Sequence, residues 1–271
     1  MSLTSSLRAV LLLAILTAIF IAIGYFFGGM FGATIGLIIA FAVNFLTFWF
    51  SDKIVLKIYR AKEYNDKKIL SMLEKLAKKA DIPIPKLYII NMEVPNAFAT
   101  GRSPNHSAVA VTSGLLDKLD DDEIEGVLAH EFSHIKHRDI LVSTLAATIG
   151  GAITWLGYLF WFGSDEKGRN ALSYVLLFIL APLAAMLIRL AISRNREYFA
   201  DRGGAAISDP LSLASALNKI SNAAKETPAQ GNAATSHMFI VNPFSGRALV
   251  GLFSTHPPVE ERIRRLKTMT R

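Results

Sequence analysis

The segment from His130 to His134 carries the residues whose types and spacing best predict chemistry. It reads His-Glu-Phe-Ser-His, an H-E-x-x-H pattern, and residues 120–129 before it have the composition of a helix. Positions i and i+4 lie on one face of a helix, so the two imidazoles can hold one zinc ion with Glu131 beside the attacking water. The pattern therefore predicts a metal-dependent peptidase.

Glu197 is the favoured third ligand, because a catalytic zinc ion usually has three protein ligands. His137 follows His130 by ~10 Å along a straight helix, so both cannot reach one ion, and His137 is expected at the surface. His134 precedes one apolar stretch (140–162) and Glu197 follows the next (171–192), each ~8–9 Å from the membrane edge on a straight helix. A surface ion pair with neighbouring arginines is the alternative for Glu197.

Asp201 lies one helical turn beyond Glu197 and shares a helix face with it. It is expected to accept the free N–H of a zinc-bound histidine, which would fix the orientation of the ring. A salt bridge to Arg202 or Arg138 explains Asp201 equally well.

Four apolar stretches approach the ~20 residues needed to cross a bilayer. They cover residues 9–27, 31–50, 140–162 and 171–192. The uncharged segment Gly28-Gly29-Met30 between the first two predicts a tight helical hairpin. A cleaved signal peptide is the alternative for the first stretch, and a buried soluble hairpin is the alternative for the last two.

Charge and composition support a membrane protein. The chain has 271 residues, 52% of them hydrophobic, a net charge of +7 and no cysteine, so thiolates cannot hold a metal. Arg8 and the amino terminus precede the first span, and lysine and arginine gather after the second, before the third and after the fourth. The positive-inside rule therefore places both termini and the large polar segments in the cytoplasm, and the charge is not expected to bind nucleic acid.

The polar segments predict a small sheet beside the H-E-x-x-H helix. The expected elements are an amphipathic helix at 65–80, strands at 86–91, 96–100 and 107–112 with a turn at 101–105, a mobile loop at 225–236, and helical pieces around 255–258. Asp120, with Glu123 three residues later, predicts a capping box at the start of the H-E-x-x-H helix.

The chain resembles the HtpX-type membrane heat-shock metallopeptidases, which are related to the CAAX prenyl endopeptidases. The resemblance covers nearly the whole chain. It rests on the paired apolar stretches at the start, Asn96-Ala97-Phe98-Ala99, His130-Glu131-Phe132-Ser133-His134-Ile135, Glu197-Tyr198-Phe199-Ala200-Asp201, and His256-Pro257-Pro258 followed by Glu261-Arg262.

The resemblance implies a zinc endopeptidase of the cytoplasmic membrane that degrades damaged membrane proteins under stress. It implies one Zn²⁺ per chain, held by His130, His134 and Glu197, with Glu131 as the catalytic base. In relatives, the residues that match His256 and Arg262 lie close to the cleft. An oxyanion contact or a place at a helix start both explain His256.

The expected fold is mainly α, an integral membrane protein with about four transmembrane helices and a cytoplasmic, zincin-like α+β catalytic domain. Its expected parts are a transmembrane hairpin (1–52), a peptidase part with the sheet (53–139), a second transmembrane hairpin (140–192) and a peptidase part with the third ligand (193–271). Asn96, Ala97, Phe98 and Ala99 are expected to form a strand edge that pairs with an unfolded or membrane-protein substrate, or an ordinary edge strand.

Three other functions remain compatible with the sequence. A prenyl-peptide endopeptidase would share the fold, although the chain has fewer apolar stretches than the prenyl peptidases. An inactive membrane chaperone or scaffold would not need Glu131. A zinc transporter would place its ligands near the bilayer midplane, whereas both ligand segments here fall outside the spans. The sequence does not specify the oligomeric state.

Overall fold

The computed structural model describes residues 3–149, 194–226, 238–241 and 257–269. Their elements are α1 (Leu3–Ile58), β1 (Lys62–Glu63), α2 (Lys67–Ala80), β2 (Lys86–Ile90), β3 (Ala97–Ser103), β4 (His106–Thr112), α3 (Ser113–Lys118), α4 (Asp121–Lys136), an apolar helix Asp139–Ile149, α7 (Arg194–Ala205), α8 (Pro210–Glu226) and α10 (Val259–Thr268). The predicted span at 171–192, the rest of that at 140–162, most of the predicted loop at 225–236, the helical piece before residue 255 and His256 lie outside the described residues.

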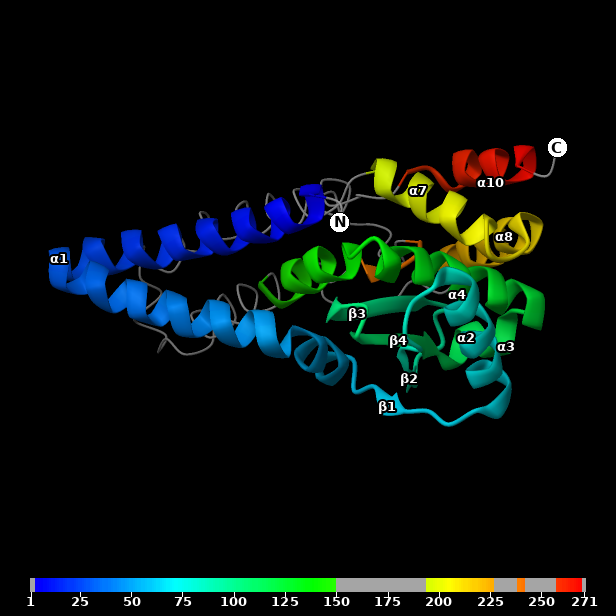
Figure 1. The fold of residues 1–271 in the computed structure, drawn as a ribbon, viewed down its shortest axis with the longest axis horizontal. Helices are drawn as coiled ribbons and strands as arrows, with labels where there is room; N and C mark the ends of the chain where they lie inside the picture. The colour runs from blue at the N-terminus through cyan, green and yellow to red at the C-terminus, as the bar shows by residue number, and fades with distance from the viewer. Residues whose placement is uncertain (1–2, 150–193, 227–237, 242–256, 270–271) are drawn as a thin grey trace.

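Helix α1 is a hairpin of two antiparallel arms (Figure 1). Gly28 and Gly29 leave the helical conformation, and Gly29 has a φ of 56°, so the predicted joint is confirmed. Asn44 in the second arm donates to Thr17 Oγ1 in the first arm, at 2.7 Å. Within the described part of the chain, α1 is the helix long and apolar enough to cross a membrane. The predicted total of about four spans is therefore not established.

The sheet is small and mixed, with strand order β1-β2-β4-β3. β2 runs parallel to β4, and the other two pairings are antiparallel. The three predicted strands are present, with bounds shifted by up to three residues, whereas β1, α3 and α8 were not predicted. The β3–β4 turn lies at residues 103–106 rather than 101–105, because Gly101 pairs with Ser107 before a register shift in β3. The chain is thus mainly helical with a small mixed sheet.

Helix α4 lies between the sheet and the C-terminal helices (Figure 1). Its start is the predicted capping box, in which Asp120 accepts from the N–H of Glu123 and the Glu123 side chain accepts from the N–H of Asp120. Buried Val127, Leu128 and Phe132 join the core that α4 shares with α2, β3 and α8. The residues before the H-E-x-x-H motif are therefore helical, as predicted, and they pack in the core of the domain.

Helix α7 approaches α4 at two adjacent glycines. A Cβ on Gly204 would lie 2.9 Å from the backbone nitrogen of His130, and a Cβ on Gly203 would lie 2.2 Å from Oγ of Ser133. Larger residues at these positions would force the helices apart. The close approach sets the distance between the motif on α4 and the carboxylates of α7.

The α1 hairpin packs against the domain near this motif. Ala9, Leu12 and Leu16 of its first arm contact buried residues of the helix Asp139–Ile149. Val55, at the end of its second arm, packs with Phe98 of β3. The apolar arms are thereby connected to the same strand and helix that flank α4.

Candidate metal centre

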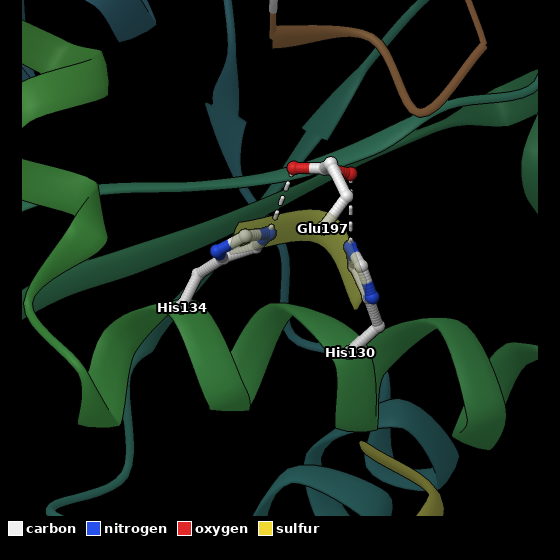
Figure 2. A group of neighbouring side chains, drawn as sticks. All are labelled: His130, His134 and Glu197. Atoms are coloured by element: carbon white, nitrogen blue, oxygen red, sulfur yellow. Dashed lines mark ion pairs between the residues drawn. The ribbon is translucent and has the colours of Figure 1, made fainter. Parts of the chain in front are cut away.

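Three potential ligands converge from α4 and α7. Glu197 faces the imidazoles of both His130 and His134 (Figure 2). Nε2 of His130 lies 3.7 Å from one oxygen of Glu197, and Nε2 of His134 lies 3.5 Å from the other. Ligands of a tetrahedral zinc ion at ~2.0–2.2 Å would stand roughly 3.3–3.6 Å apart. The three ligand atoms, all within 4.8 Å of one another, are thus close to the spacing that one ion requires.

Each imidazole faces an aspartate through its second nitrogen. Nδ1 of His130 lies 3.0 Å from Oδ1 of Asp201, and Nδ1 of His134 lies 3.3 Å from Oδ2 of Asp139. A neutral imidazole that donates from Nδ1 presents the lone pair of Nε2, which is the form that binds a metal. Both rings therefore have an acceptor on the side away from Glu197. Of the two sequence interpretations of Asp201, the structure shows contact with a histidine.

Two arginines hold these aspartates. Arg262 is fully buried and donates to both oxygens of Asp201, at 2.9 and 2.7 Å, while its Nη1 lies 3.5 Å from Glu197. Arg196 forms an ion pair with Oδ1 of Asp139. A buried guanidinium is costly unless it is paired, so Arg262 depends on these carboxylates.

Glu131 is buried and lines the same cavity as the two histidines. Its Oε2 accepts a hydrogen bond of 2.8 Å from the backbone N–H of Ala99 in β3. Burial raises the pKa of Glu131 above its ordinary value, against the opposing charges of His130 and His134. A carboxylate with a raised pKa is suited to take a proton from water and return it to a leaving group.

The charges of the centre suit a divalent cation. Glu131, Asp139, Glu197 and Asp201 bring four carboxylates together, and among the described residues Arg196 and Arg262 form ion pairs with three of them. Burial alone would lower the pKa of His134, but the hydrogen bond to Asp139 and the charges of Glu197 and Glu131 raise it to about 9. An ion at the three ligands would replace that proton.

The ligands line a small cavity. It measures about 60 Å³ and is bounded by Phe98 and Ala99 of β3 and by residues 238–240. Such a volume admits an ion and a few waters. Asn96 fixes this boundary, since its side chain donates to Met238 O at 3.3 Å and accepts from the N–H of Ile240 at 3.0 Å.

The structure places the other predicted residues as follows. Strand β3 is an edge strand of the described sheet, but Asn96, Ala97 and Ala99 are buried rather than open to solvent. His137 is exposed and its Nδ1 contacts Ser133 O at 2.7 Å, as expected for a residue outside the centre. His256 lies outside the described residues.

Asp139 and Arg196 were not predicted. The sequence signal for Asp139 is its position five residues after His134, which becomes meaningful only because Arg138 adopts a left-handed conformation with a φ of 59°. Nothing in the local sequence of Arg196 distinguishes it from the two neighbouring arginines.

Comparisons with known proteins agree with this geometry. The profile of peptidase family M48 matches residues 63–270. The "Protease HtpX homolog" of Persephonella marina is 52% identical over 245 residues, covering 85% of each chain. That of Syntrophotalea carbinolica is 50% identical over 238 residues, covering 84% of this chain and 85% of the relative. The crystal structure of S. mikatae Ste24p is similar with a TM-score of 0.50 and 19% identity, over 84% of this chain and 57% of Ste24p, which indicates a shared fold.

Proposed function

We propose that this chain, which belongs to peptidase family M48 and is a membrane metalloendopeptidase of the HtpX type, uses zinc to cleave unfolded or damaged membrane proteins at the cytoplasmic face. The observation that carries the proposal is the convergence of His130, His134 and Glu197 within 4.8 Å, beside three further carboxylates and two arginines. The two imidazoles and a carboxylate are a ligand set typical of catalytic zinc.

The roles of the individual residues follow from their contacts. His130, His134 and Glu197 would hold the ion, which when bound supplies Lewis-acid polarisation of the scissile carbonyl and of the attacking water. Glu131 takes a proton from the water and gives it to the leaving amine. Because the N–H of Ala99 fixes Oε2 of Glu131, the carboxylate is oriented before substrate arrives.

His256 is proposed to donate a hydrogen bond to the developing oxyanion. Support comes from the residues that follow it, since Pro257 is buried and Arg262 of α10 contacts Asp201 beside the ligands. Arg262, six residues after His256, thus lies beside the centre.

An extended substrate is proposed to lie along β3. The strand has one partner, β4, in the described sheet, and its Ala99 N–H is directed to Glu131 rather than to β4. Backbone pairing along such an edge is tolerant of sequence, which suits unfolded substrates. Residues 238–240, which Asn96 holds, lie beside β3 at the same cavity.

The membrane side of the domain supports action close to the bilayer. Arg102 of β3 lies over the ring of Trp49, with 4.7 Å between its Cζ and the ring centroid, near the end of the second α1 arm. Tryptophan and arginine side chains commonly mark the membrane interface. Lys53 and Lys57 follow on the same helix, whereas the joint at Gly28 and Gly29 is uncharged, and by the positive-inside rule this supports a cytoplasmic position of the domain.

A proteolysis assay tests the proposed substrate class. The detergent-purified protein is expected to cleave unfolded β-casein and to leave a folded globular protein of similar size intact. A chelator should stop the cleavage, and added zinc should restore it. Equal cleavage of the folded protein, or cleavage that the chelator does not affect, would contradict the proposal.

Cysteine labelling tests the orientation of the protein in the membrane. Because the chain contains no cysteine, only the introduced residue can react. In right-side-out cells, Met30→Cys at the hairpin joint should react with a membrane-impermeant maleimide. Lys78→Cys on the exposed face of α2 should react only after the cells are opened. The reverse pattern would place the domain outside the cytoplasm.

A further inference from the structure

We propose that Asp139 and Arg196 are positioning residues that fix the tautomer and the orientation of His134. The inference rests on the proposed function of His134 as a metal ligand. It is supported by two consecutive contacts. Nδ1 of His134 faces Oδ2 of Asp139 at 3.3 Å, and Oδ1 of Asp139 forms an ion pair with Arg196.

The local backbone directs Asp139 at the imidazole. Helix α4 ends at Lys136, and Arg138 then adopts a left-handed conformation with a φ of 59°. A residue with a side chain pays a steric cost in this conformation, so the surrounding structure must favour it. The turn brings Asp139, the first residue of the next helix, back against His134, where its side chain is 12% exposed.

The arrangement around His130 is of the same kind. Nδ1 of His130 faces Asp201, and Asp201 is held by Arg262. Two histidines on one face of α4 thus each meet a carboxylate that is clamped by an arginine from a different helix. The pair at His130 comes from α7 and α10, and the pair at His134 comes from the Asp139–Ile149 helix and α7. Because the same arrangement occurs twice on different elements, it indicates a shared role rather than a chance ion pair.

Arg196 decides what an amide in place of Asp139 would do. In an Asp139→Asn variant, the guanidinium can donate only to the amide oxygen, because Arg has no acceptor for the amide NH₂. The amide NH₂ would then point at Nδ1 of His134 and favour the tautomer with its proton on Nε2. That proton would occupy the lone pair that faces Glu197 and the metal.

The test measures zinc affinity by competition with a chelator, and the absorption spectrum of the cobalt-substituted protein, in the full-length chain in detergent. Asp139→Asn is expected to weaken zinc binding by about 10- to 100-fold and to change the cobalt spectrum. Adding Arg196→Met should recover part of the affinity, because the amide can then turn its oxygen to His134. Asp209→Asn at the exposed start of α8, where Asn also caps well, is the matched control.

The outcomes separate this inference from the proposed function. Wild-type protein without bound metal would overturn both. If wild type binds one ion and Asp139→Asn has the same zinc affinity and cobalt spectrum, the positioning role alone is overturned. The same follows if the double variant binds zinc no more tightly than Asp139→Asn. If the single variant does not fold, ¹⁵N NMR of zinc-loaded, histidine-labelled wild type decides: a proton on Nδ1 of His134 with zinc on Nε2 is expected, and zinc on Nδ1 with the proton on Nε2 would contradict it.

Discussion

Glu131→Gln protein is expected to keep its metal and lose its peptidase activity. The amide cannot take a proton from water, and general acid–base groups of this kind contribute about 10²- to 10⁴-fold to rate. Cleavage of β-casein should therefore fall by at least about a hundredfold. Metal content should stay at one ion per chain, because Glu131 contacts Ala99 and is not one of the three converging ligands.

Glu125→Gln is the matched control for that experiment. Glu125 lies on the same helix, six residues before Glu131, and pairs with Lys75 away from the cavity. Its variant should cleave casein at the wild-type rate. Full activity in Glu131→Gln would remove Glu131 from the mechanism, and loss of metal from it would mean that the residue holds the ion.

Replacement of Glu197 by Ala is expected to have the largest effect on metal affinity. The variant keeps both imidazoles but loses the carboxylate that faces them, at 3.5 and 3.7 Å. Removing a ligand should weaken zinc binding by more than the about 10- to 100-fold typical of its outer hydrogen-bond partners. Activity at a fixed, low zinc concentration should fall with it.

Glu74→Ala on the exposed face of α2 controls for general loss of carboxylates. Thermal unfolding of each variant without metal shows whether the fold persists, since Arg262 loses one of its carboxylate neighbours in Glu197→Ala. Unchanged zinc affinity in Glu197→Ala, with the fold intact, would leave the third ligand unidentified.

Much of the fold and of the metal centre could be predicted because the sequence patterns that indicate them are local. The spacing of His130 and His134 on a helix, the cap at Asp120 and the glycines of the α1 joint each depend on a few neighbouring residues. The prediction of Glu197 as the third ligand needed a further assumption. It was that two consecutive apolar stretches return the chain to the same side of the membrane. The structure places Glu197 beside both histidines.

The remaining contacts depend on tertiary structure. Asn96 holds residues that lie more than 140 positions later, and no periodicity predicts such a contact. Arg262 meets Asp201 only because α10 packs on α7. Asp139 reaches His134 through a left-handed Arg138, a conformation more often signalled by glycine or asparagine. The same long-range packing explains why Ala97 and Ala99 are buried although β3 lies at the edge of the described sheet.

X-ray absorption at the zinc edge, recorded on the purified wild-type protein, tests the central claim most directly. A buried divalent ion shared by His130, His134 and Glu197 predicts one zinc per chain with two imidazole nitrogens and at least one oxygen at ~2.0–2.2 Å. A protein that holds no metal after zinc loading, or a coordination shell with fewer than two imidazoles, would contradict the account.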